Sequence, residues 1–243
     1  MSTHAKKHRR ILPAAVCTLL ILFACITVYA SSYYRAGEQA LSSLQSDDAV
    51  TVTVEKNGTV IFAPLIAKRG LIFYPGGKVE HTAYAPLLKA LAEEGWFCVL
   101  LEMPLRLAVL DADAADGIPE QFPFISEWYI GGHSLGGAMA ASYAADYSDF
   151  YEGLILLGSY STKDISKTDL NTYTLYGSED KVLNLVKYES YRDNLPATTQ
   201  ELIIDGGCHA YFGDYGPQDG DGEPAITAME QVRISVDFIS PTN

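Results

Sequence analysis

The stretch "GGHSLGGAM" at residues 131–139 places one serine, Ser134, between glycines directly after an apolar run. A serine hydroxyl becomes an effective nucleophile when a base takes its proton. A sharp turn from a buried strand into a helix would expose the hydroxyl, and it requires small neighbouring residues. Gly132, Gly136 and Gly137 meet this requirement. Ser134 is therefore the candidate nucleophile, and the alternative is a small residue in a turn without chemical function.

The base for such a serine would be a histidine, and the sequence contains only five. Two precede a long apolar segment, one lies well upstream of Ser134, and one adjoins Ser134 with its ring expected to point away from the hydroxyl. These four are His4, His8, His81 and His133. His209 lies downstream in "DGGCHAYFGDYG", directly after a buried strand. Active sites of open α/β sheets gather at the carboxyl ends of strands, so His209 is the predicted base.

A carboxylate should fix the tautomer of this histidine and stabilise its charged form. Asp180 in "LYGSEDKVL" follows a strand and completes the chain order serine, aspartate, histidine. Glu179 is the neighbour that could replace it, and Asp205 precedes the loop of His209. We predict Asp180, with Glu179 as a solvated neighbour and Asp205 as a residue at a strand end.

The oxyanion formed by nucleophilic attack requires hydrogen-bond donors. One would be the N–H of Leu135, which follows the nucleophile at the start of a helix. A second should come from the loop after an earlier strand, and "FYPGGKVE" provides such a loop. The N–H of Gly77 is the first choice and that of Lys78 the second. The alternative interpretation of this loop is a simple turn.

Buried strands that alternate with helices would position these residues. Asn57-Gly58 predicts a hairpin within residues 52–64, and Gly95 is expected to end a helix over 84–94. Further strands are expected at 70–75, 96–103, 127–132, 152–160, 171–177 and 199–205, and further helices at 108–120, 135–147, 181–193 and 223–239. Continuous apolar strands that alternate with helices predict an α/β fold, with a mostly parallel sheet and helices on both faces.

From about Val50 onward the chain resembles the α/β-hydrolase superfamily. Within it, the chain is similar to the small lidless branch called α/β-hydrolase family 5, related to dienelactone-hydrolase-like proteins. The motifs that carry the resemblance, in chain order, are "YPGGKVE", "MPLRLAV", "GGHSLGGAMAA" with "GLILLGSY", "LYGSED", and "GGCHAYFGDYG" with "QDGDGE".

The resemblance implies a nucleophile at Ser134, an acid at Asp180 and a base at His209, with Gly77 and Leu135 as oxyanion donors. Two positions depart from the expected pattern, since Tyr-Pro-Gly replaces the common His-Gly and a cysteine stands where Asn is expected before the histidine. Dienelactone hydrolases use a cysteine nucleophile, so a serine indicates the esterase-like majority.

The walls of the substrate cleft are less distinct in the sequence. Only residues 161–170 separate two predicted strands where a lid domain could be inserted, so we expect an open cleft without a lid. Met103 and Tyr211 are predicted to border this cleft, and packing is the alternative for both. The acidic loop 213–224 lacks calcium-loop spacing and is interpreted as a solvated rim.

The amino-terminal region indicates a membrane segment. Residues 1–10 contain four basic side chains, and no charge occurs between Ile11 and Tyr34. About 20 apolar residues in a helix span the hydrocarbon layer of a bilayer, so 11–30 is predicted as a transmembrane anchor, with a cleaved signal segment as the alternative. The basic flank predicts a cytoplasmic amino terminus and an extracytoplasmic or secreted catalytic domain. Residues 31–48 would form a tether, and 49–243 the hydrolase domain.

Charge and cysteine content narrow the function further. Without the four amino-terminal cations, 13 basic residues face 30 acidic ones, a net charge of −17 that disfavours nucleic acid as a partner. Cys98 and Cys208 are too few for a disulfide scaffold, although a bridge between them is conceivable. No metal or other cofactor is expected, and the domain is expected to act as a monomer.

Together these features predict a serine hydrolase that cleaves ester-type bonds of small molecules through an acyl-serine intermediate. The alternatives are a peptidase or amidase with the same residues, and a non-catalytic binding protein on the same fold.

Overall fold

The computed structural model describes residues 18–24 and 27–241. Residues 18–24 and 27–31 are helical, and the compact unit that carries the fold begins at Tyr34. The described residues include no helix with both the length and the apolar character needed to cross a membrane. The basic segment 1–10 lies outside the described residues, as do residues 11–17 and 25–26 of the predicted anchor.

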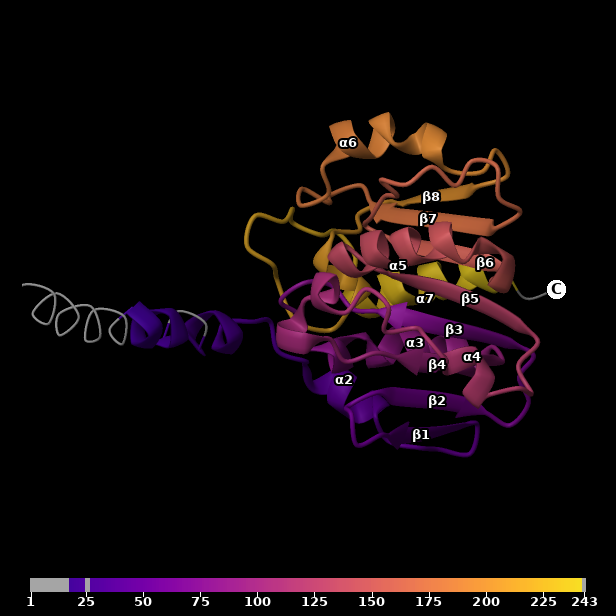
Figure 1. Ribbon diagram of the computed structural model, residues 1–243, viewed down its shortest axis with the longest axis horizontal. Helices are drawn as coiled ribbons and strands as arrows, with labels where there is room; N and C mark the ends of the chain where they lie inside the picture. The colour runs from indigo at the N-terminus through magenta and orange to yellow at the C-terminus, as the bar shows by residue number, and fades with distance from the viewer. Residues whose placement is uncertain (1–17, 25–26, 242–243) are drawn as a thin grey trace, which may run out of the picture. The chain divides into compact units, whose positions relative to one another are not determined.

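Eight strands form one mixed, mostly parallel sheet in the order β1-β2-β4-β3-β5-β6-β7-β8 (Figure 1). Strand β1 pairs antiparallel with β2, and β2 pairs antiparallel with β4, whereas all other pairs are parallel. The strands are β1 (Val50–Val54), β2 (Val60–Pro64), β3 (Arg69–Tyr74), β4 (Trp96–Leu100), β5 (Glu127–His133), β6 (Gly153–Leu157), β7 (Asn171–Gly177) and β8 (Gln200–Ile204). This arrangement confirms the predicted α/β class.

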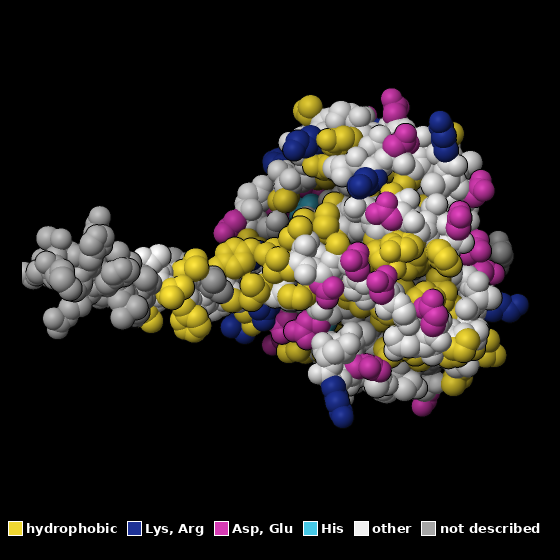
Figure 2. All heavy atoms as spheres, in the orientation of Figure 1, with side chains coloured by type: hydrophobic (Ala, Val, Ile, Leu, Met, Phe, Trp, Pro, Cys, Tyr) yellow, Lys and Arg dark blue, Asp and Glu magenta, His cyan; other side chains and the backbone are white. Residues whose placement is uncertain are grey.

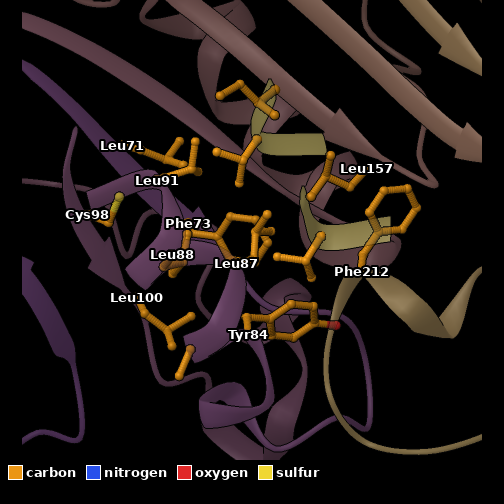
Figure 3. Packing of buried hydrophobic residues seen from close by; sticks show 14 of the residues in the cluster. Leu71, Phe73, Tyr84, Leu87, Leu88, Leu91, Cys98, Leu100, Leu157 and Phe212 are labelled. Atoms are coloured by element: carbon orange, nitrogen blue, oxygen red, sulfur yellow. The ribbon is translucent and has the colours of Figure 1, made fainter. Parts of the chain in front are cut away.

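The central strands are buried on both faces because side chains alternate across the sheet. In β3, Leu71 and Phe73 belong to one apolar cluster, whereas Ile72 and Tyr74 belong to the other. Figure 3 shows the first cluster, in which Leu71 and Phe73 lie near Leu88 and other side chains of the covering helix. Each buried leucine of this kind contributes about 2–5 kcal/mol relative to alanine, so the strands form a rigid base for the loops at their ends.

Helices cover both faces of the sheet. Helices α3 and α7 pack together over the first cluster, and the small residues of α5 approach the second cluster closely. The helices are α2 (Glu38–Ser43), α3 (Ala85–Glu93), α4 (Ile118–Gln121), α5 (Leu135–Asp146), α6 (Leu185–Ser190) and α7 (Ala228–Ile239). A capping box of Thr227 and Glu230 sets the start of α7 and explains why it is shorter than the predicted helix 223–239.

Residues 34–48 pack onto the domain, which differs from the tether predicted for 31–48. Ala40 in α2 is buried, and its N–H donates to the Asp214 carboxylate at 2.8 Å. The carboxylate therefore satisfies a free donor in the first turn of the helix. The composition of this segment is polar and small, as in a linker, but its hydrogen bonds make it part of the fold.

Tyr34 enters the domain beside a loop at the carboxyl edge of the sheet. It forms an isolated parallel bridge with Val79, which follows the glycines of the predicted oxyanion loop. Its ring lies 5.7 Å from that of Tyr215, and its hydroxyl accepts a hydrogen bond from the Asp219 N–H at 3.0 Å. The first residues of the compact unit thus contact two of the loops that surround the candidate site.

Two predicted helices differ from the structure. Within 108–120 only a short turn and α4 are helical, because the Ala- and Asp-rich stretch lacks a continuous apolar face. The helix predicted at 181–193 begins at Leu185, since the N–H groups of Val182 and Leu183 donate to the side chain of Asp180 instead.

The two cysteines of the domain are unpaired. Cys98 and Cys208 are free thiols and both are buried, so no bridge joins them. Burial raises the pKa of the Cys208 thiol to about 12 and that of Cys98 well above its usual value. Both thiols are therefore protonated and unreactive at neutral pH.

Candidate active site

Ser134 occupies the turn between β5 and α5, where the chain reverses sharply. Its φ of 53° and ψ of −123° lie in a region that residues with a Cβ rarely adopt. The neighbouring glycines are required by contact, because a Cβ at Gly136 would overlap the Tyr74 carbonyl oxygen and one at Gly132 would approach it to 2.5 Å. The strain of about 1–3 kcal/mol is thus maintained by tight packing around the serine.

His209 and Asp180 form a buried pair. The Nδ1 atom of His209 lies 2.7 Å from Oδ2 of Asp180, and the two residues are 1% and 5% exposed. Because a carboxylate only accepts, Nδ1 carries a proton, and in the neutral form of the ring Nε2 has the lone pair. Nε2 is buried and has no hydrogen-bond partner among the described residues. The ring therefore presents a free basic nitrogen, as a general base must.

Asp180 is itself held by the backbone that follows it. Its other oxygen, Oδ1, accepts hydrogen bonds from the N–H groups of Val182 and Leu183 at 2.9 and 2.7 Å. The neighbours proposed as alternatives do not take this position. Glu179 is half-buried beside Ser178, and Asp205 is exposed.

The turn after β6 contacts all three predicted triad residues. The Leu157 carbonyl accepts from the Ser134 N–H at 2.9 Å, and the Ser159 hydroxyl donates to the Ser134 carbonyl at 2.8 Å. Between them, a Cβ on Gly158 would lie 2.9 Å from Nδ1 of His209 and 3.4 Å from Oδ2 of Asp180. Three residues far apart in sequence therefore surround one short turn at the carboxyl edge of the sheet.

The two predicted oxyanion donors are neighbours in space. A Cβ on Gly77 would lie 3.1 Å from a methyl group of Leu135. Neither backbone N–H is engaged by an acceptor in the described part of the chain. The N–H of Lys78, the second choice, donates to the Arg106 carbonyl at 2.9 Å and is not available. The structure thus leaves Gly77 and Leu135 with donors that can bind an anion.

His133 packs between the loop of the predicted nucleophile and the ring of His209. Its Nδ1 shares a 2.8 Å hydrogen bond with the Tyr84 hydroxyl, which also accepts from the Gly76 N–H at 3.1 Å. Its ring lies 4.4 Å from that of His209. Burial, and then the proximity of His209, hold the pKa of His133 well below its usual value, so this ring is neutral. The His133 ring is therefore buried in the protein. His81, the other histidine upstream of His209 in the domain, hydrogen-bonds to the Gly58 carbonyl.

Two side chains hold the backbone on either side of His209, and sequence reasoning assigned neither to the site. The buried Gln231 accepts from the Cys208 N–H at 3.0 Å and donates to the Cys208 carbonyl at 2.8 Å. Asp221 accepts from the Ala210 N–H at 2.9 Å. Asp221 belongs to the loop 213–224, which was interpreted from the sequence as a solvated rim. The only signal for Asp221 in the sequence is the "QDGDGE" motif, which carried the family resemblance without a stated function.

Met103 and Tyr211, predicted to border the cleft, occupy different environments. Met103 is 3% exposed and lies in the second apolar cluster, and it also lines a cavity of about 440 Å³ with Leu105 and Arg106. Tyr211 is half-buried against the first cluster, two residues after His209.

Other features of the surface do not include Ser134, Asp180 or His209. A cavity of about 550 Å³ is lined by residues of β7, β8 and the segment after α6, among them Thr174, Arg192 and Glu201. Two of its charged side chains pair with each other, with 2.8 Å between the guanidinium of Arg192 and the Glu201 carboxylate. Carboxylates are spread over the face shown in Figure 2, in keeping with the acidic composition. The described residues contain no cluster of His, Cys, Asp and Glu that could hold a metal ion.

Comparisons with known proteins agree with this architecture. Residues 70–233 match the profile of an alpha/beta hydrolase family, and the chain belongs to this family, as the resemblance implied. Comparison with curated proteins gave no match.

Solved structures of the same fold include hydrolases and esterases. A protein titled as a predicted CIB-like hydrolase from Thermoplasma acidophilum is 18% identical and superposes with a TM-score of 0.55 over 80% of this chain and 99% of its own. Est1E from Butyrivibrio proteoclasticus is 12% identical, with a TM-score of 0.56 over 79% and 98% of the two chains. A carboxylesterase from Bacillus subtilis is 10% identical, with a TM-score of 0.58 over 85% and 96%. At these identities the similarity establishes the fold.

Proposed function

We propose that this hydrolase is a serine esterase that cleaves small acyl esters through Ser134, His209 and Asp180. The observation that carries the proposal is the buried His209–Asp180 pair, with Nε2 left unpartnered, around the same turn that binds the strained Ser134. A pair of this kind costs free energy to bury and is unnecessary for packing. Its value lies in orienting a base.

In the first half of the reaction, the Ser134 hydroxyl attacks the ester carbonyl carbon while Nε2 of His209 takes its proton. Asp180 keeps the proton of the imidazole on Nδ1 and stabilises the positive charge that forms on the ring. The tetrahedral oxyanion accepts hydrogen bonds from the N–H groups of Gly77 and Leu135. The alcohol then leaves with the proton from Nε2, and Ser134 carries the acyl group.

In the second half, water replaces the alcohol. Nε2 of His209 takes a proton from the water as its oxygen attacks the acyl carbon, and the same two N–H groups bind the second oxyanion. Collapse returns the proton from Nε2 to the oxygen of Ser134 and releases the acid. The chain is neither consumed nor changed in charge over the cycle.

The ester preference is supported by the architecture and by the neighbours in structure. No lid domain separates β6 from β7, and this favours access of small soluble substrates. Two of the solved structures with this fold carry the names of esterases, Est1E and a carboxylesterase.

Replacement of Ser134 with alanine tests this function directly. Turnover of short p-nitrophenyl esters should fall by a factor of about 10⁴ or more, since the three residues act as a unit. A fluorophosphonate probe should label the wild-type protein and not the variant. Ser190→Ala, at an exposed position in α6, is the control and should retain full activity. Unchanged ester turnover in Ser134→Ala would reject the proposed function.

We also propose that residues 11–30 anchor the protein in a membrane, with the hydrolase domain on the extracytoplasmic side. The uncharged apolar composition of this segment and the four basic residues before it support the proposal. Carbonate-washed membranes should retain the full-length chain, and protease added outside spheroplasts or sealed cells should degrade the domain. Recovery of a chain shortened at its amino terminus in the medium would indicate a cleaved signal instead.

A further inference from the structure

We propose that Asp221 is a positioning residue that joins the loop of Asp180 to the loop of His209. This inference rests on the proposed function, because it concerns the alignment of the same pair. The loop 213–224 contains several acidic residues, but Asp221 alone among them hydrogen-bonds to both of these loops in the described structure. Its role follows from the backbone groups that its two oxygens bind.

Each oxygen of the Asp221 carboxylate binds a different loop. Oδ2 accepts from the N–H of Ala210, the residue directly after His209, at 2.9 Å. Oδ1 accepts from the N–H of Lys181, the residue directly after Asp180, at 3.3 Å. The two backbone positions lie in separate βα connections, after β8 and after β7. One side chain therefore fixes the distance between the segments that carry the acid and the base.

The loop that carries Asp221 is itself fixed in position. Oδ1 also accepts from the Gly222 N–H at 2.8 Å, which orients the carboxylate. Gly222 packs so closely on the Glu179 carbonyl that a Cβ would overlap it. A glycine next to the aspartate thus allows the loop to lie directly against the Asp180 segment.

Asp221 is charged in the folded protein. Burial acts to raise its pKa, but the backbone N–H donors outweigh burial and hold the pKa below the usual value. Hydrogen bonds from N–H groups to a charged acceptor are stronger than neutral ones, so this carboxylate is a better clamp than an amide would be. The aspartate in this position is explained by the two loops it holds, in addition to any effect on solubility.

The side chain on the opposite flank limits the expected effect of a substitution. Gln231 binds both backbone groups of Cys208, so His209 stays held on its amino-terminal side when Asp221 is changed. The loop should loosen without unfolding. A displacement of about 1 Å in a catalytic group typically costs about a hundredfold in rate, and partial loosening should cost about tenfold to a hundredfold.

The test compares Asp221→Asn with Asp219→Asn. Both remove one negative charge from the same loop, and the Asp219 side chain is exposed, whereas its bond to Tyr34 uses the backbone N–H. The rate constant kcat is measured with short p-nitrophenyl esters and divided by the number of sites that a fluorophosphonate labels. We expect kcat per labelled site to fall about tenfold to a hundredfold in Asp221→Asn, with KM changed less than about threefold, and to stay unchanged in Asp219→Asn.

Hydrogen exchange provides a second measurement that does not depend on turnover. In Asp221→Asn the amides of peptides covering 179–183 and 208–212 should exchange faster than in the wild-type chain, while Asp219→Asn should leave both peptides unchanged. Exchange that is unaltered in either peptide would overturn the proposal. A kcat per labelled site equal to that of Asp219→Asn would also overturn it, because any lower total activity would then reflect only a smaller number of folded molecules. If the wild-type chain is neither labelled nor active, but exchange in both peptides is still faster in Asp221→Asn, the esterase function is rejected. The clamp between the two loops is then still supported.

Discussion

Ser134 shows how one residue is placed by others that have no chemical role. Its backbone angles are unfavourable for a residue with a side chain, and they persist because β5, β6 and α5 fix both ends of the turn. The close approach of Gly136 to the carbonyl of Tyr74 leaves no room for a different turn. The backbone of this proposed nucleophile is thus held in place by its surroundings.

His133, next to Ser134, contributes a pH dependence of stability. Its folded-state pKa is depressed by burial and by His209, whereas in the unfolded chain it has an ordinary value near 6.5. Below that pH the unfolded state binds a proton that the folded state excludes, so stability is complete above about pH 6.5 and decreases as the pH falls.

We predict that the free energy of unfolding of the wild-type chain decreases by up to about 1.4 kcal/mol per pH unit from this group between pH 6.5 and 5. Denaturant titrations at several pH values should show a shallower decrease for His133→Gln, because the variant lacks the proton uptake. The difference between the two slopes isolates this residue, since the other groups titrate in both proteins. Parallel slopes would contradict the prediction.

At the scale of the elements, the amino-terminal segment is part of the fold. Helix α2 and Tyr34 contact the loops that carry Asp214 and Val79, and Lys89 of α3 forms a 2.7 Å ion pair with Asp47. A domain cut at residue 49, where the sequence predicted its start, would lose all of these contacts.

We predict that a chain of residues 34–243 unfolds cooperatively, and that a chain of residues 49–243 is less stable by at least about 2 kcal/mol. The shorter chain leaves the Asp214 carboxylate without the Ala40 N–H and exposes the apolar surface beneath Ala40. Equal urea midpoints for the two chains would show that the segment is a tether after all.

Much of this architecture was accessible from the sequence because its signals are local. Apolar runs, the Asn57-Gly58 hairpin and Gly95 are each readable within a few residues, and the strands they predicted lie close to β1–β8. Ser134, Asp180 and His209 could be nominated because each follows such a run, and parallel strands bring their carboxyl ends to one edge.

The remaining features depend on contacts that leave no local pattern. Asp221 binds backbone N–H groups, which every residue except proline provides, so the sequence of its partners contains no signal. The same holds for Gln231 and the Cys208 backbone. Residues 34–48 have the composition of a linker, and only the acceptor at Asp214, far along the chain, makes α2 part of the domain.

At the scale of the whole molecule, many buried protonated groups make the fold sensitive to alkali. Burial raises the pKa of Cys208 to about 12, and it raises the pKa values of Cys98 and Tyr84 as well. Above about pH 9 the unfolded chain releases protons that the folded chain retains, so stability is complete below that pH and is lost as the pH rises.

We predict that the melting temperature stays level from about pH 7.5 to 8.5 and then decreases steadily toward pH 11. Each thiol or phenol contributes at most about 1.4 kcal/mol per pH unit once its unfolded form ionises. Cys208→Ala should decrease less steeply between pH 9 and 11 than the wild-type protein. Calorimetry across this range measures both slopes, and a constant melting temperature up to pH 11 would contradict the prediction.

The entry of Tyr34 beside Val79 has a practical consequence for handling the protein. Helix α7 runs back from the carboxyl edge of the sheet and ends at the opposite edge, away from the point where Tyr34 begins the domain (Figure 1). A bulky tag or a solid support fused just before residue 34 would therefore lie beside the loops that carry Val79 and Asp219. Attachment through the carboxyl terminus would leave these loops, and the proposed active site that they border, facing the bulk solvent.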